Sequence, residues 1–193
     1  QLAIERLELL REVHHRAKNS LQMTLTLLET SDFSSPEATV ATINRVRAIG
    51  LVYDLVDGAV DLSSISLEEY MERLIGHIQM SAEYGPVMID ASLSGDHRTR
   101  IEPTINYGLM VHEIVSLICR YAYDLQPGTI GLRQVREEEY LRLDLSHRGN
   151  ELPASVEPNQ AMGSDMGLLP ALLERLHCEA TLARGDTTNW SIR

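Results

Sequence analysis

The chain has few basic residues for its length. Its 193 residues include 17 lysines and arginines against 28 aspartates and glutamates, and the formal net charge is −11 at pH 7. Lys18 is the only lysine. Nucleic acids are held largely through their phosphates by patches of cationic side chains. The charge balance therefore argues against a nucleic acid as partner.

Cysteine is scarce as well. Cys119 and Cys178 lie far apart and match no spacing typical of a metal site or a redox pair. Cys119 falls inside an apolar helical pattern, which predicts a buried free thiol. The two cysteines therefore indicate no reactive centre.

Long hydrophobic runs are missing too, although hydrophobic residues make up 44% of the chain and predict a folded protein. No stretch approaches the ~18 apolar residues of a membrane-spanning helix, and no signal peptide is recognisable. We therefore expect a cytoplasmic segment without membrane contact. The chain opens on Gln1, already in a helical pattern, so excision from a longer sensor protein is an open alternative.

A helical pattern runs through residues 2–30. Seven of its positions alternate at spacings of three and four, as on the a/d seam of a helical bundle: Leu7, Leu10, His14, Ala17, Leu21, Thr24 and Leu28. His14 occupies the seam, so we expect it to be largely buried. His15 is rotated from it by about 100° and points to the side.

The surroundings of His15 suit a phosphoryl group. Arg16 and Lys18 flank it, and Asn19 lies one helical turn further on. From these residues alone, an ordinary surface histidine is the simpler alternative.

A second helix is predicted over residues 36–57. Ser35 is a favourable N-cap with Pro36 at the first helical position, and Gly58 ends the helix. Two long helices joined by a short loop leave an apolar seam that needs a partner, and two copies would close it into a four-helix bundle. We therefore predict a homodimer through residues 1–58.

Residues 59–193 predict a second unit, an α/β sandwich with helices on one face of a mixed sheet. Residues 59–66 form its connector, and 147–165 are polar and irregular. Helices are predicted over 67–84, where Ser66 is the N-cap, 102–124 and 168–178. Strands are predicted over 86–93, 129–136, 140–146, 179–184 and 189–193, the second and third forming an antiparallel hairpin. The fold class of the whole chain is therefore α+β.

Residues 9–22, with the sequence LLREVHHRAKNSLQ, resemble the phosphoacceptor box of bacterial sensor histidine kinases of the HisKA_2 family, which is related to the HWE kinases. In that family an arginine replaces the usual acidic residue after the phosphorylated histidine. The resemblance implies that His15 is the phosphoacceptor and that Arg16, Lys18 and Asn19 are its catalytic neighbours.

The second unit resembles the ATP-binding domain of the same kinases. Residues 107–122 resemble its N-box helix, and Glu113 matches the box. Leu117 stands where the family has the asparagine that holds the nucleotide's Mg²⁺, and leucine has no oxygen to offer a hard cation. The resemblance therefore includes the helix but not its metal ligand.

The two other nucleotide boxes depart from the family as well. His147 replaces the aspartate that accepts from the adenine amino group, and Glu151 replaces a glycine. In the third box Gly167 is retained and the other of the family's two glycines is lost, and Asp165 places negative charge where phosphates should bind. We therefore expect no ATP binding; the alternative is a divergent but competent site.

These residues predict a histidine phosphotransferase. His15 would exchange phosphate with an aspartate of a response-regulator receiver domain, and the chain would bind no cofactor because the receiver brings its own Mg²⁺. One alternative is an ATP-dependent sensor histidine kinase. Others are a response-regulator phosphatase, in which Asn19 orients water, and a non-catalytic dimeric scaffold.

Overall fold

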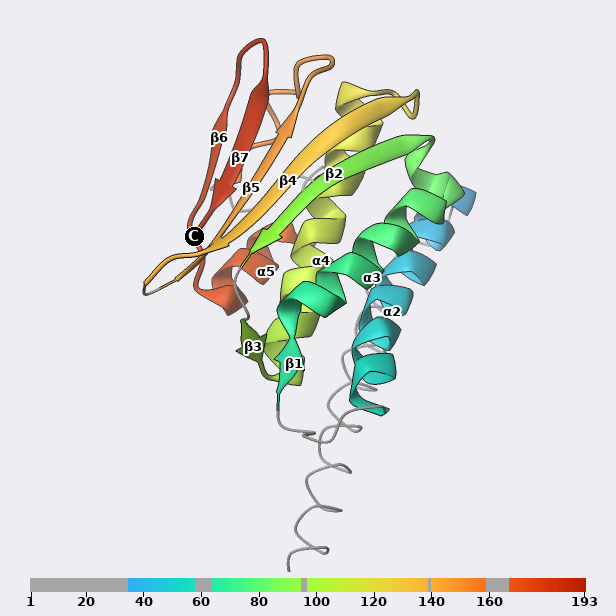
Figure 1. Ribbon diagram of the computed structural model, residues 1–193. Coiled ribbons are helices and arrows are strands. Elements are labelled where there is room, and N and C mark those ends of the chain that lie inside the picture. Colours follow the sequence, from blue (N-terminus) through green and yellow to red (C-terminus); the bar gives the residue numbers. More distant parts are fainter. Residues whose placement is uncertain (1–34, 58–63, 95–96, 139, 159–166) are drawn as a thin grey trace, which may run out of the picture.

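A five-stranded mixed sheet with helices on one face dominates the protein (Figure 1). The structure, a computed structural model, describes residues 35–57, 64–94, 97–138, 140–158 and 167–193. The strand order is β2 (Val87–Ser94), β4 (Gly128–Arg136), β5 (Leu141–His147), β7 (Thr188–Ile192) and β6 (Ala180–Ala183). β2 runs parallel to β4, and the other neighbouring pairs are antiparallel. The α+β fold class is therefore confirmed.

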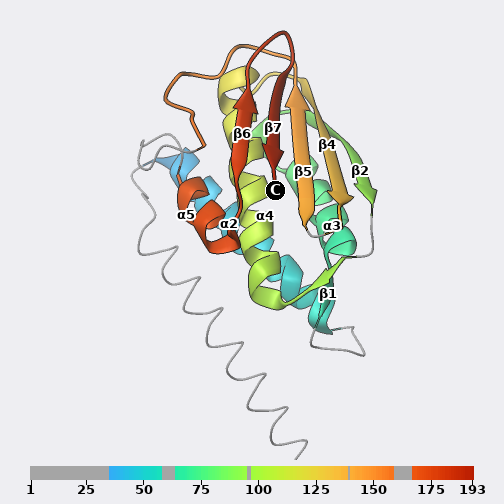
Figure 2. The same cartoon turned by 90° about the vertical axis from the view of Figure 1, so that its left-hand side faces the viewer.

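Three helices cover one face of this sheet, and a fourth lies outside them (Figure 2). The covering helices are α3 (Leu67–Met80), α4 (Ile101–Leu117) and α5 (Leu169–Leu176). We call them, together with the sheet, the α/β sandwich. The outer helix is α2 (Pro36–Asp57), which packs on α4 and α3.

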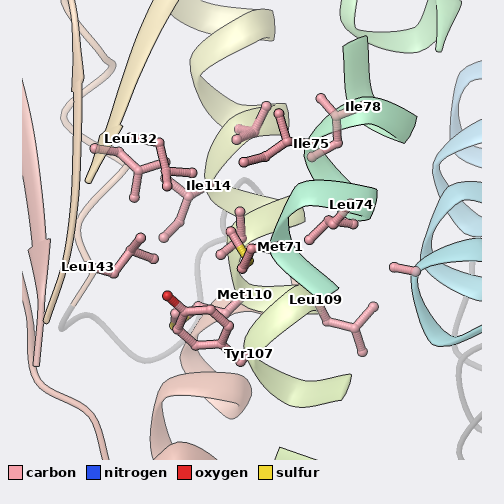
Figure 3. Close-up of a cluster of buried hydrophobic side chains, with 14 of the residues drawn as sticks. Met71, Leu74, Ile75, Ile78, Tyr107, Leu109, Met110, Ile114, Leu132 and Leu143 are labelled. Carbon is pink, nitrogen blue, oxygen red and sulfur yellow. The ribbon is translucent and has the colours of Figure 1, made fainter. Parts of the chain in front are cut away.

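The centre of the core is α4, which is buried along nearly its whole length. In Figure 3, Ile114 on α4 faces Leu132 and Leu143 of the sheet. On its other side α4 meets the apolar face of α3, which presents Met71, Leu74, Ile75 and Ile78. Cys119, just beyond α4, is a free thiol and 1% exposed, as predicted, and burial raises its pKa to about 12.

Local sequence signals place several elements correctly. Ser35 Oγ accepts a hydrogen bond from the Ala38 amide at 3.1 Å, which confirms the predicted N-cap of α2. Ser66 Oγ accepts from the Glu69 amide at 3.3 Å at the start of α3. The β4–β5 hairpin is present with the predicted strands.

Two features differ from the sequence prediction. The short strands β1 (Ile65–Ser66) and β3 (Arg98–Thr99) pair antiparallel, although residues 59–66 were predicted as a connector and no strand was predicted between residues 93 and 102. The helix predicted to reach residue 124 changes after Leu117 into a π-helical turn, Ile118–Ala122. Asp124 and Leu125 follow with positive φ, and the Leu125 carbonyl lies against Gly85, 2.2 Å from where a Cβ would be.

Only one side of α2 is covered in the described part of the chain. Ala48, Ile49 and Val52 belong to the hydrophobic core of the α/β sandwich. Val40 and Ile43, by contrast, are 39% and 45% exposed. The helix predicted over 2–30 and the boundary near residue 58 lie outside the described residues, so the division into 1–58 and 59–193 and the dimeric bundle stay predictions.

Gly108 of α4 lies directly against Tyr70 of α3, and this close approach provides a test of the packing. A Cβ added at Gly108 would lie 1.7 Å from Oη of Tyr70, which is fully buried and donates to the Ala48 carbonyl of α2 at 3.1 Å. We expect Gly108→Ala to lower the free energy of unfolding by about 1–3 kcal/mol through overpacking.

Two other helical glycines serve as controls in the same denaturant titration. An added Cβ at Gly50 or Gly76 meets nothing within 4 Å. We expect Gly50→Ala and Gly76→Ala to raise the free energy of unfolding by about 0.5–1 kcal/mol, because alanine is the better helix former. An unchanged unfolding midpoint for Gly108→Ala would contradict the observed fit of α3 against α4.

Candidate functional site

The predicted phosphoacceptor lies outside the described residues. This holds for His15 and for Arg16, Lys18 and Asn19, so their placement stays a prediction. The described residues instead include most of the segments that resemble a nucleotide site, on α4, at the end of β5 and before α5.

The N-box positions lie on α4. Glu113 and Leu117 are four residues apart, so they share one face of the helix. Leu117 is 5% exposed and belongs to the hydrophobic core. Its side chain offers a hard cation no ligand. Among the described residues, no group of three histidine, cysteine or acidic side chains is placed to hold a metal ion.

Glu113 is bound by an arginine from α2. Arg45 Nε donates to Glu113 Oε1 at 2.7 Å, and Arg45 Nη2 donates to Oε2 at 3.0 Å. His112 Nδ1 lies 3.5 Å from the same Oε1. Burial by itself raises the pKa of Glu113, but His112 and Arg45 outweigh it and lower the pKa to about 2. The carboxylate is therefore charged at neutral pH, and both its oxygens are occupied by Arg45.

Gly167 lies directly against this pair. Its φ is +53°, and a Cβ there would lie 2.6 Å from Glu113 Oε2 and 3.6 Å from Arg45 Nη2. The glycine retained from the third nucleotide box thus contacts the N-box glutamate instead of leaving space above it. Asp165, from the same box, lies outside the described residues.

His147 occupies the last position of β5. The alternation along the strand turns Leu143, Leu145 and His147 toward the helices, and His147 is 3% exposed. Its ring meets Tyr123 edge to face, with centroids 6.1 Å apart. Neither ring nitrogen has a hydrogen-bond partner among the described residues. Burial lowers the pKa of His147 to about 4, so the imidazole is neutral at physiological pH.

An open cavity of about 670 Å³ lies at this end of β4 and β5. Tyr123, Thr129, His147, Arg148 and Thr187 contribute to its lining. No acidic residue is among its described lining residues, so it offers no carboxylate to accept from an adenine amino group.

Arg45 is the residue of this site that sequence reasoning missed. It lies within the predicted helix, four residues from Ala41 and three from Ala48, both of which are buried. That spacing places Arg45 on the covered face of α2, which is the one signal that could have identified it.

The buried His147 makes stability depend on pH. Above pH 6.5 the imidazole is neutral in both the folded and the unfolded chain. Between pH 6.5 and 4 the unfolded chain binds a proton that the folded chain does not, because the folded pKa is about 4. We expect the free energy of unfolding to fall with decreasing pH in this window, by up to about 1.4 kcal/mol per pH unit.

Denaturant titrations between pH 7 and 4 measure this slope. His147→Leu should flatten it, whereas His97→Gln, at a partly exposed position before β3, should leave it unchanged. Glu113 affects stability in a different pH window. Its pKa in the folded chain is lowered to about 2, so the stability contributed by the charged carboxylate is lost only as the pH falls from 4.5 toward 2. If the free energy of unfolding of His147→Leu depended on pH as steeply as that of the wild type, the assignment of this pH dependence to His147 would be wrong.

Comparison with known proteins gives matches over the N-terminal and the C-terminal parts. Residues 12–82 match the HisKA_2 family model, described as histidine kinase. The sensor histidine kinase PdtaS of Mycobacterium tuberculosis is 28% identical over 174 residues, which are 80% of this chain and 32% of that protein. The blue-light-activated histidine kinase 2 of Erythrobacter litoralis is 26% identical over 189 residues, which are 92% of this chain and 54% of that protein.

The fold has a counterpart among solved structures. The blue-light activated histidine kinase EL346 of Erythrobacter litoralis superposes with a TM-score of 0.69 at 24% identity, covering 95% of this chain and 60% of that one. The chain spans about a third to a half of the length of these curated relatives. In the described part of the chain, no helix is long and apolar enough to cross a membrane. The chain therefore resembles sensor histidine kinases of the HisKA_2 family in sequence over residues 12–82, and over most of its length it has the fold of a histidine kinase.

Proposed function

We propose that the chain is a histidine phosphotransferase of a cytoplasmic two-component phosphorelay. It carries a phosphoryl group on His15 to or from an aspartate of a response-regulator receiver domain, and it does so without binding ATP. The segment around His15 resembles a phosphoacceptor box, which supports His15 as the carrier of the phosphoryl group. Residues 12–82, which include His15, match the family model.

The ion pair between Arg45 and Glu113 is the main observation in support of the second statement, that the chain does not bind ATP. Both oxygens of Glu113 accept from Arg45, so the N-box carboxylate takes part in an ion pair within the chain. The apolar Leu117 and the neutral, buried His147 at the two other nucleotide positions support the same conclusion. We therefore expect the chain to receive phosphate from a phosphorylated partner and not from ATP.

The transfer itself needs little from this chain. A neutral imidazole nitrogen of His15 attacks the phosphorus of the receiver's phosphoaspartate, the new N–P bond forms, and the O–P bond breaks with its electrons returning to the carboxylate. An unperturbed histidine pKa near ~6.5 leaves much of the imidazole neutral at cellular pH. Arg16 and Lys18 complement the acidic pocket of the receiver, which supplies the Mg²⁺.

A homodimer closed through residues 1–58 is part of the proposal. Val40 and Ile43 support it, because they expose apolar surface on the side of α2 that faces away from the α/β sandwich. A second copy of the hairpin would bury such surface in a four-helix bundle.

Incubation of the wild-type chain with a receiver domain labelled on its aspartate tests the proposal. We expect the label to move to the chain in an acid-labile, alkali-stable form typical of phosphohistidine. Label that stays on the receiver would overturn the phosphotransferase. Label that is released as inorganic phosphate, without labelling the chain, would favour the phosphatase with Asn19 as the water-orienting residue.

A further inference from the structure

We propose that the Arg45–Glu113 pair, which we call the α2–α4 ion pair, positions α2, the second helix of the predicted hairpin, on the α/β sandwich. In its closed state the pair holds α2 in one rotational setting, and its opening permits α2 and the sandwich to move relative to each other. The effect of this positioning on phosphoryl transfer rests on the proposed function; the positioning itself does not.

The geometry of the α2–α4 ion pair is directional. Two parallel hydrogen bonds join a planar guanidinium to a planar carboxylate, so both the distance and the orientation of the two groups are fixed. The partners are 68 residues apart in sequence and come from different helices. Their side chains are 19% and 7% exposed, so water screens the interaction poorly.

The neighbours of the pair reinforce a single setting of α2. Asn44, which precedes Arg45 on α2, donates to Ser81 Oγ at 3.1 Å and to the Glu83 carboxylate. Gly167 covers the pair from the segment before α5. The apolar contacts of Ala48, Ile49 and Val52 bury the same face of α2. The polar contacts add directional hydrogen bonds to this packing and so reinforce one rotational setting of α2.

A change in that setting is costly and discontinuous. Rotation of α2 by one residue, about 100°, would remove Arg45 from Glu113 and leave a buried carboxylate without its cation. Breaking a buried pair while one charge stays buried is strongly unfavourable, so intermediate settings are poorly populated. The interface consequently has a closed and an open state, with little between them.

Unused hydrogen-bonding groups beside the pair favour opening. Asn44 Oδ1, Tyr84 Oη and Nε2 of His112 are buried without a hydrogen-bond partner among the described residues. The rings of Tyr84 and His112 are in edge-to-face contact, with centroids 5.6 Å apart. Groups of this kind gain hydrogen bonds to water when the interface opens, which lowers the free energy of opening.

Amide hydrogen exchange in Arg45→Met and Glu113→Gln tests the positioning role in the full chain. We expect exchange in residues 36–57 to accelerate by about tenfold or more, equivalent to about 1.4 kcal/mol, while exchange in β4 and β5 stays within about twofold. Glu113→Gln keeps the shape of the side chain, so it provides the comparison if Arg45→Met fails to fold. Arg73→Met is the matched control, because it removes an arginine from an exposed pair with Glu69 at 2.9 Å.

Unchanged exchange in residues 36–57 would overturn the inference. Equal acceleration in α2 and in the sheet would overturn it as well, because a purely structural ion pair would weaken both. The rate of phosphoryl transfer from a labelled receiver to the same variants gives the second measurement, with a change of about threefold or more expected for Arg45→Met and none for Arg73→Met. A wild-type chain that takes up no phosphate would refute the proposed function, whereas hydrogen exchange would still decide the positioning role.

Discussion

In a His15→Ala variant, no label should pass from a phosphorylated receiver domain to the chain. The imidazole of His15 is the proposed nucleophile, and alanine cannot form the N–P bond. Because the heptad pattern places His15 beside the seam, its removal should cost little stability. Phosphotransfer measured by gel autoradiography, together with thermal unfolding of the same variant, checks both statements.

His14→Ala is the matched control for this prediction. His14 occupies a seam position, so its replacement should weaken the helical bundle while leaving the nucleophile in place. We expect this variant to unfold at a lower temperature and to retain label uptake under folding conditions. Mass spectrometry that located the phosphoryl group on His14 would falsify the helical register on which the assignment depends.

Mg-ATP should show no measurable binding to the wild-type chain at millimolar concentrations. Leu117 removes the metal ligand and His147 the adenine acceptor. Each missing charge-assisted contact costs about 1.5–3 kcal/mol. Two such losses weaken binding by about two orders of magnitude or more, at about 1.4 kcal/mol per tenfold. Titration calorimetry measures the affinity, and incubation with labelled ATP should produce no phosphohistidine.

Restoration of a single ligand should not recover nucleotide binding. Leu117→Asn returns an amide oxygen to α4, but Glu113 stays bound to Arg45 and His147 stays buried. We therefore expect Leu117→Asn to bind Mg-ATP no better than the wild type. A micromolar affinity in either protein would contradict the phosphotransferase and establish the ATP-dependent sensor kinase as the better description.

The elements that could be predicted from the sequence are those whose signals are local. The N-caps Ser35 and Ser66 act within three residues of themselves, and both are observed. The strands of the β4–β5 hairpin alternate between buried and more exposed positions, and the turn between them is short. β1 and β3 escaped prediction because each has two residues, and because their pairing joins positions about thirty residues apart.

The residues of the candidate site also differ in whether their sequence signals are local. Leu117 and His147 could be identified because each replaces a residue in a recognisable motif. The role of Arg45 could not, because it depends on a partner 68 residues away and on how α2 docks against α4. His15 was identified from its motif, and its surroundings lie outside the described residues.

The α2–α4 ion pair also bears on how long Glu113 can persist during evolution. A glutamate that had served only nucleotide chemistry would be free to drift once the metal ligand and the adenine acceptor were lost. Here its replacement would leave the guanidinium of Arg45, whose side chain is 19% exposed, without its counterion. Folding therefore constrains Glu113 independently of any nucleotide chemistry, and substitutions at the two positions should occur together in related chains.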